Sequence, residues 1–444
     1  FQYHDRDDFE IYTYSLNRPM STKNEGEDDE VTAIQNGSDC FKLLPPSELS
    51  LLDMAKQIQD DELHIIVDLC GYAGTSKVAE LMSLLKQQHQ QQQQHFPVQI
   101  SYMGFPGSSG APYIDYMIVD DIVVPPPTHQ KSGSNDNEWW SVRKWYTEGL
   151  IYMPHCYFVN SHLHCAHDAL LPSHDGRGEA LDKRKNRYGL PSNNDNDGFV
   201  FCCHSRPDKI DPKTFRVWLN ALDRVRHHNQ DQQHENMPRM NNAVLWLLKS
   251  CDEMEDNLRL IVKEEYPNLS QEALIFASIA ERNEHLSRLA CADLFLDTPS
   301  YNAHTLGCDA LFVGVPMISL LRPDNGERED DYVNSNTEIG TTKLASRVGA
   351  SLLRAAGMYD EMVCEDMISY EELMVSCALN KDGWYDHARQ KLISSREECP
   401  LFNTKRWVQN LELAFREIAW NSGDSFKGSE RRRKGTNDDI LILD

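Results

Sequence analysis

The stretch DTPSYNAHTLGCD, residues 297–309, has the residue types of a phosphate-binding loop. It follows the apolar run Leu294–Leu296 and leads into an apolar segment, so we expect a buried strand, a polar loop and a helix that opens near His304 and Thr305. The first turn of a helix presents unpaired N–H groups and a positive dipole end, which suit a phosphate. A capped helix without a ligand is the alternative interpretation.

Lys209 is a candidate cation for the same phosphate. It follows the apolar run FVFCCHS, residues 199–205, and precedes Asp211 and Pro212, where we expect a turn from a strand into a helix. The helix dipole disfavours a lysine at this place unless an anion is present, so a bound phosphate would explain it. The alternative is a plain surface lysine.

Two further segments could contact a ligand. In ASIAERNEHLSR, residues 277–288, the side chains of His285 and Arg288 lie three positions apart and would share one helix face. The glycines of GFPGSSG, residues 104–110, would let the backbone approach a ligand closely. A solvated amphipathic helix and an ordinary turn are the respective alternatives.

Acid–base chemistry has candidates around an apolar strand in the first half of the chain. His64 and Asp61 precede the run IIVD and Asp68 ends it. A histidine in front of an apolar strand can also be purely structural, and this alternative stays open for His64.

The elements that must position these residues alternate along the chain. Short continuous apolar runs separated by helical stretches predict parallel strands buried on both faces, and therefore an α/β fold. A chain of 444 residues favours two domains. We predict an N-terminal lobe, a linker, a nucleotide-binding lobe, a C-terminal helix and a polar tail, at residues 1–161, 162–187, 188–398, 399–420 and 421–444.

Composition limits the classes of partner. With 44 Lys and Arg against 69 Asp and Glu, the net charge is −25, so we expect no nucleic-acid or anionic-membrane partner. Twelve cysteines without a CxxC pair suggest a reducing compartment, the cytoplasm or the nucleus. The run RRRK, residues 431–434, is either a nuclear-localisation patch or a solvated charge cluster.

The loop 297–309 also resembles the donor-binding lobe of the O-linked N-acetylglucosamine transferase family, which includes SPINDLY-related members. Other blocks with the family's order cover nearly the whole chain: HIIVDLCGY (64–72), PVQISYMGFPGSSG (97–110), DYMIVDD (115–121), YTEGLIYMPH (146–155), YGLP (188–191), KIDP (209–212), VLWLL (244–248), LASRVGAS (344–351) and PLFNTK (400–405). The resemblance implies a GT-B fold, in which two doubly wound Rossmann-like lobes face a cleft. It also implies that the final helix, around residues 407–418, returns towards the first lobe.

The resemblance implies a protein glycosyltransferase that moves N-acetylglucosamine from UDP-GlcNAc to Ser or Thr hydroxyls without a metal or other cofactor. Lys209 would neutralise the donor diphosphate and Asp309 would hold the ribose, although Asp309 could equally be a first-turn acid. The remaining donor-site positions implied by the family are Arg206, Ala280, Arg282, His285, Arg288, His304, Thr305 and Leu306, and Gly104, Pro106 and Gly107 would line the sugar and acceptor cleft.

Three departures from the family pattern keep other functions open. Leu306 replaces a threonine and Asp208 stands where relatives often have tyrosine. Only eight residues precede Phe9, so we expect that the first segment of the lobe, with its cleft histidine, and an N-terminal helical repeat array are missing from this chain. The alternatives are a protein O-fucosyltransferase that uses GDP-fucose and a catalytically weak sugar-nucleotide-binding scaffold.

Overall fold

The computed structural model describes residues 1–17, 27–72, 77–92, 97–126, 142–165, 185–191, 198–228, 241–322, 343–424 and 439–442. The chain forms two compact units, residues 1–157 with 404–444, and residues 158–403. Most of the predicted linker, residues 162–187, lies outside the described residues, and the predicted domain boundaries stay a prediction.

The first unit is built on a parallel sheet. Its described strands, in the order β13-β6-β5-β4-β3, are β13 (Ile440–Leu441), β6 (Gly149–Tyr152), β5 (Tyr116–Val119), β4 (Val98–Ser101) and β3 (Ile65–Asp68). Every neighbouring pair is parallel. A two-stranded parallel sheet precedes it, from β1 (Tyr12–Ser15) and β2 (Cys40–Leu43). The predicted polar tail therefore supplies a short edge strand, β13, which the sequence did not reveal.

Four described helices belong to the first unit. They are α1 (Glu27–Asn36), α2 (Leu51–Gln59), α3 (Val78–Gln92) and α15 (Thr404–Asp424). Ser50 caps α2 by accepting a hydrogen bond from the Asp53 N–H, and Met54 and Ile58 on this helix enter a core that also takes in Leu81 and Leu85 of α3.

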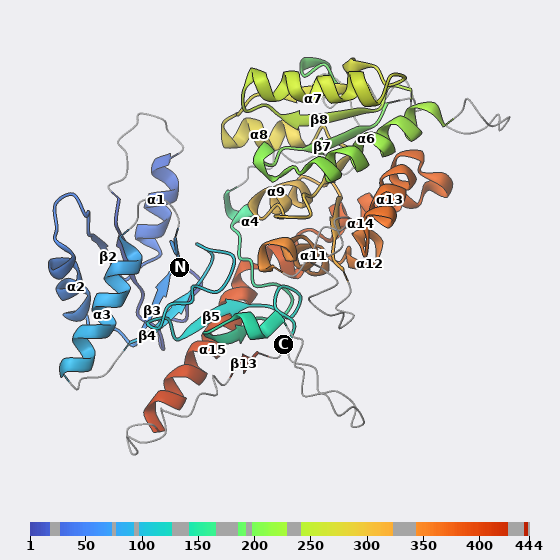
Figure 1. Ribbon diagram of the computed structural model, residues 1–444. Coiled ribbons are helices and arrows are strands. Elements are labelled where there is room, and N and C mark those ends of the chain that lie inside the picture. Colours follow the sequence, from blue (N-terminus) through green and yellow to red (C-terminus); the bar gives the residue numbers. More distant parts are fainter. Residues whose placement is uncertain are drawn as a thin grey trace, which may run out of the picture. The chain divides into compact units, whose positions relative to one another are not determined.

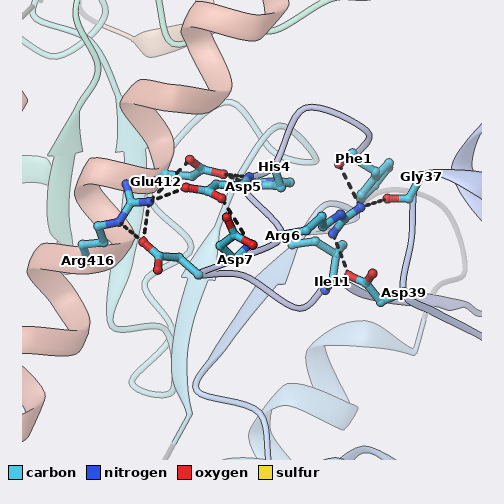
Figure 2. A network of polar contacts seen from close by, with 11 residues as sticks. Phe1, His4, Asp5, Arg6, Asp7, Ile11, Gly37, Asp39, Glu412 and Arg416 are labelled. Carbon is cyan, nitrogen blue, oxygen red and sulfur yellow. Dashed lines mark hydrogen bonds and ion pairs between the residues drawn. The ribbon is translucent and has the colours of Figure 1, made fainter.

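The helix α15 belongs to the first unit although a whole second unit separates it in the chain (Figure 1). Its Glu412 is 3% exposed and accepts hydrogen bonds from His4 Nδ1 at 2.9 Å and from the Asp5 N–H at 2.8 Å (Figure 2). One turn on, Arg416 pairs with Asp8 at 2.9 Å. The predicted return of this helix to the first lobe is confirmed.

The second unit has a longer parallel sheet. Its described strands run in the order β12-β11-β10-β7-β8-β9, with bounds β12 (Val363–Cys364), β11 (Met317–Leu320), β10 (Leu294–Leu296), β7 (Val200–Cys203), β8 (Val244–Leu248) and β9 (Leu274–Ala277). All neighbours are parallel, and β7, β10 and β11 are wholly buried. Both faces must therefore be covered, as the continuous apolar runs predict.

Helices connect or flank these strands, as in other α/β folds. They are α4 (His162–Cys165), α6 (Pro212–His227), α7 (Asp252–Glu265), α8 (Arg282–Leu289), α9 (Thr305–Phe312), α11 (Val348–Ala355), α12 (Tyr359–Met362), α13 (Met367–Leu379) and α14 (Trp384–Ser395). Asp211 caps α6, and Pro212 occupies its first turn. The predicted α/β class with two Rossmann-like lobes is confirmed.

Candidate functional site

The strand order of the second unit creates a switch point between β7 and β10. From β7 the chain proceeds through β8 to β9 on one side, and it then crosses to the other side of β7 to form β10. In open parallel sheets, ligands bind beyond the carboxyl ends of the strands at such a reversal. The segments that follow β7 and β10 contain Lys209 and the loop 297–309, the two features predicted to hold phosphate.

A pocket of about 500 Å³ lies at this edge. Its walls come from the turn after β7 and from the loop and first helical turn after β10. The lining residues are Arg206, Asp208, Lys209, Asp211, Ser300, Tyr301, Ala303, His304, Thr305 and Leu306. The structure thus brings Arg206, Lys209, His304, Thr305 and Leu306 together, although Lys209 and its hydrogen-bond partner Asn302 lie 93 positions apart in the chain.

Lys209 is held in the pocket by neutral groups. It ends a short 3₁₀ turn, Pro207–Lys209, and its Nζ donates to the Asn302 carbonyl oxygen at 3.0 Å. The same ammonium lies 4.1 Å from the centre of the Tyr301 ring, a cation–π contact. Partial burial lowers the pKa of Lys209, while the nearby Asp297 raises it. The lysine thus retains donor capacity for an anionic ligand.

The helix α9 opens at the pocket. His304 is its N-cap and offers no side-chain cap, so the first-turn N–H groups are available to a ligand. Burial, followed by the positive charge of Lys209, lowers the pKa of His304 to about 3, and its imidazole is therefore neutral near pH 7. Its buried Nε2 has no hydrogen-bond partner among the described residues. Thr305 beside it is exposed, and Leu306 is half-buried.

The loop before α9 rests on Asp297, whose role the sequence analysis missed. Asp297 is fully buried and accepts hydrogen bonds from the Ala303 N–H and the Ser319 hydroxyl, each at 2.6 Å. Burial raises the pKa of its carboxyl to about 7. A Cβ atom at Gly349 would lie 2.2 Å from Asp297 Oδ2, so only glycine fits there. Asn302 also binds this glycine, accepting from its N–H at 3.0 Å.

Asp309, on α9, is surrounded by cationic and imidazole groups. Its Oδ1 lies 2.7 Å from His162 Nε2, and its Oδ2 lies 3.4 Å from His285 Nε2. Arg282 NH1 is 3.9 Å away. Burial alone would raise the pKa of Asp309, but the hydrogen bond with His162 and the nearby His285 imidazole outweigh it and lower this pKa to about 2. Asp309 is therefore a carboxylate at any working pH, able to accept from hydroxyl groups.

The other predicted nucleobase residues lie at the start of α8 and along it. Ala280 is half-buried just before the helix, and Arg282 is exposed. Arg288 is 5% exposed and donates from NH1 to the Ser278 carbonyl oxygen. His162 on α4 and His204 after β7 join this cluster, and neither was predicted. Each is one histidine without a surrounding motif, so no signal in the sequence distinguished it.

His64 and Asp61 lie elsewhere, in the first unit. They stand at the amino end of β3, since Ile65 pairs with the first residue of β4. Asp61 bonds with Lys42 Nζ and, at 2.6 Å, with the Tyr14 hydroxyl. Because the loop 104–110 follows the carboxyl end of β4, the structure does not bring Asp61 and His64 together with it. Their catalytic role stays a prediction.

The loop 104–110 is tightly fixed. A Cβ atom at Gly104 would lie 2.1 Å from the carbonyl carbon of Cys70, so the turns after β3 and β4 touch through backbone. Glu148, 1% exposed, accepts from the Ser108 hydroxyl at 2.6 Å and from the Ser109 N–H at 2.7 Å. Pro106 and Gly107 are half-buried between these anchors. The loop presents a rigid backbone at the carboxyl edge of its sheet.

Two features are absent from the described residues. These residues hold no group of three or more His, Cys, Asp or Glu side chains with the placement of a metal site. None of their helices combines the length and apolar character needed to span a membrane.

Comparison with known proteins shows which sequences this chain resembles. The probable UDP-N-acetylglucosamine–peptide N-acetylglucosaminyltransferase SEC of Arabidopsis thaliana is 32% identical over 421 residues, which are 95% of this chain and 35% of that protein. The UDP-N-acetylglucosamine–peptide N-acetylglucosaminyltransferase of Caenorhabditis elegans is 22% identical over 92% of this chain and 38% of its own length. The chain thus spans little more than a third of these relatives.

A solved structure supports the fold. A mutant O-GlcNAc transferase of Thermobaculum terrenum superposes with a TM-score of 0.66 at 21% identity, over 96% of this chain and 64% of that one. The predicted GT-B class is confirmed. The family model described as glycosyl transferase family 41 matches residues 1–171 and 176–411. A match over nearly the whole chain leads to one conclusion: this protein belongs to glycosyl transferase family 41.

Proposed function

We propose that this chain transfers N-acetylglucosamine from UDP-GlcNAc to Ser or Thr hydroxyls of proteins in the cytoplasm or nucleus. Membership of glycosyl transferase family 41 and the names of the plant and nematode relatives support this assignment. The described cysteines are free thiols, which agrees with a reducing compartment.

One observation carries the proposal: Lys209 and the open end of α9 meet in a single pocket at the sheet's switch point. A diphosphate in this pocket would receive an ammonium from one wall and helix N–H groups from the other. The ammonium and the N–H groups both attract a negatively charged ligand. This local attraction is needed because the whole chain, with a net charge of −25, repels anions.

The reaction needs this arrangement because the leaving group becomes more negative. When the acceptor oxygen attacks the anomeric carbon, the bond from that carbon to the diphosphate oxygen breaks and the electron pair stays on UDP. Preorganised donors aimed at this oxygen lower the barrier. We assign that role to Lys209 and to the N–H groups at His304 and Thr305, with Arg282 adding positive charge nearby. These groups make a metal ion unnecessary in our proposal.

The acceptor must also lose a proton. We retain His64 and Asp61 as the candidate acid–base residues from the sequence. The proton acceptor would be found by measuring the pH dependence of single-turnover transfer in His64→Asn and Asp61→Asn variants.

Calorimetry with UDP and GDP, followed by transfer assays with UDP-GlcNAc and GDP-fucose on a Ser/Thr peptide, tests the proposal. We expect UDP to bind with a micromolar dissociation constant, clearly more tightly than GDP, and only UDP-GlcNAc to give product. Preferential GDP binding with fucose transfer would establish the fucosyltransferase alternative. Binding of UDP without any turnover would leave a sugar-nucleotide scaffold.

A further inference from the structure

His204 is a buried histidine whose polar atoms are unsatisfied. It directly follows β7 and is only 2% exposed. Neither Nδ1 nor Nε2 has a hydrogen-bond partner among the described residues. Buried polar atoms normally have partners, because leaving a buried donor or acceptor unpaired destabilises the fold. A bound ligand that supplies the missing hydrogen-bond partner would explain why this imidazole is buried.

The surroundings keep this imidazole neutral. Its ring stands edge-on to Trp246, with centroids 4.5 Å apart and an interplanar angle of 76°. Burial, followed by the electrostatic influence of the nearby Arg288 and His285 side chains, holds the pKa of His204 far below its ordinary value. A neutral imidazole carries one N–H donor and one acceptor nitrogen, so it can complement a polar edge that offers either.

Other unsatisfied nitrogens lie close by. The His285 ring is 6.1 Å from the His204 ring, and its Nε2 has no partner in hydrogen-bond geometry, although Asp309 Oδ2 stands 3.4 Å away. The Nε of Arg288 is likewise buried without a partner among the described residues. Nitrogen atoms of His204 and Arg288 are therefore left without partners close to His285, whose Nε2 lies near Asp309, and a polar ligand would supply the missing partners.

We infer that His204 recognises the nucleobase of the donor, hydrogen-bonding through a ring nitrogen to the polar edge of uracil beside His285 and Arg288. This inference rests on the proposed function, because it assigns the base within the same UDP site. It gives His204 a specificity role that the pattern FVFCCHS does not suggest, since the residue looks like the polar end of a strand.

The substitution His204→Phe tests the inference. Phenylalanine keeps a flat ring against Trp246 and removes both unsatisfied nitrogens. We expect the ligand-free variant to melt several degrees higher than the wild type, because replacing an unpaired buried polar ring by an apolar one is favourable. We also expect its dissociation constant for UDP to rise about tenfold, the effect of one lost hydrogen bond. A purely structural histidine would not produce opposite changes in stability and affinity.

Inorganic pyrophosphate, which has no base, separates the base contact from the phosphate contact. His204→Phe should bind pyrophosphate as the wild type does, whereas Lys209→Ala should lose affinity for both ligands. The control is Gln99→Met, which removes another buried and partly unsatisfied side chain in the first unit and should leave UDP binding unchanged.

The outcomes distinguish this inference from the proposed function. If wild type binds UDP and His204→Phe binds it equally well, the inference is wrong and the donor assignment stands. If wild type does not bind UDP, the proposed function itself fails. Should His204→Phe fail to fold, His204→Leu replaces it, and equal UDP affinity in that variant overturns the inference in the same way.

Discussion

The charge of Lys209 is the feature of this site that depends most clearly on one residue. Its ammonium is held by a carbonyl oxygen and an aromatic face, and neither partner cancels its charge as a carboxylate would. The buried acid Asp297, which acts on Lys209 electrostatically, accepts hydrogen bonds from Ala303 and Ser319 with its own oxygens. The lysine is therefore fixed in position and still able to neutralise a diphosphate.

We expect Lys209→Ala to reduce turnover about a hundredfold or more, because it removes a donor aimed at the leaving-group oxygen. Single-turnover transfer from UDP-GlcNAc is the measurement, and thermal melting checks that the fold persists. Lys263→Ala, at an exposed position on α7, is the matched control and should retain full activity. Unchanged chemistry in Lys209→Ala would remove this residue from the mechanism.

His285 and Arg288 should contribute to binding and not to the chemical step. Replacing His285 by alanine removes a ring beside the proposed base position, and we expect UDP affinity to fall about tenfold with little loss of stability. Titration calorimetry of UDP with wild type and His285→Ala measures this. Equal affinities would place the nucleobase elsewhere.

At the scale of elements, the turn from β10 into α9 depends on a buried acid. The folded-state pKa of Asp297 is raised to about 7 from an ordinary value of 3.8. Between these values the folded chain holds a proton that the unfolded chain has released. This contribution to stability is therefore fully present below about pH 3.8 and is lost as the pH rises through 7.

Asp297→Asn should remove this pH dependence. Asparagine keeps an oxygen for the Ala303 N–H and cannot titrate, so the urea midpoint of the variant should fall less than that of the wild type between pH 5 and pH 8. The difference between the two pH profiles isolates Asp297 from other titrating groups. Parallel profiles would contradict the raised pKa.

The loop 104–110 gives a second test at this scale. Glu148→Gln retains the shape but replaces a charged acceptor by a neutral amide, so hydrogen bonds from Ser108 and Ser109 weaken. We expect a loss of about 1–2 kcal/mol in the free energy of unfolding. Faster hydrogen exchange at the Ser109 amide should accompany it, and unchanged exchange there would show that the loop does not depend on Glu148.

Local patterns in the sequence predicted the elements well. The run Leu294–Leu296, the polar loop and the helix opening at Thr305 are present as β10 and α9, and the helix expected to begin near Pro212 is α6, residues 212–227. The pocket that joins Lys209 to His304 and Thr305 could also be predicted, because switch-point geometry follows from strand order once the family is suspected.

The side chains that the prediction missed act through contacts distant in sequence. His162 forms a hydrogen bond with Asp309, which lies 147 positions further along the chain. Asp297 forms a hydrogen bond with Ser319 and lies against Gly349, and both of these residues belong to later elements. A single histidine or aspartate is not part of a periodic sequence pattern. Its hydrogen-bond partners can therefore be identified only from the assembled sheet. For the same reason the two-residue strand β13 could not be distinguished from the polar residues around it.

At the scale of the molecule, each unit has its own sheet and core, so ligand binding should stabilise them unequally. At a UDP concentration a hundred times the dissociation constant, the second unit, to which we assign the UDP site, should gain about 2.7 kcal/mol. Hydrogen exchange should slow for the amides of β7, β8 and β10 and stay unchanged for β4 and β5. Equal protection of both sheets would mean that the units open together.

The pairing of His4 with Glu412 has a consequence for synthesis on the ribosome. The first unit is discontinuous, and its helix α15 begins at Thr404, 404 − 157 = 247 positions after the first portion of that unit ends. At about 5–20 residues per second, the ribosome needs roughly 12–50 s to make the intervening segment. The second unit, which is continuous, can therefore finish folding first, reversing the usual N-to-C order. Until α15 has been synthesised, the first unit lacks Glu412 and cannot complete its fold. During this period the incomplete unit would be exposed to chaperones.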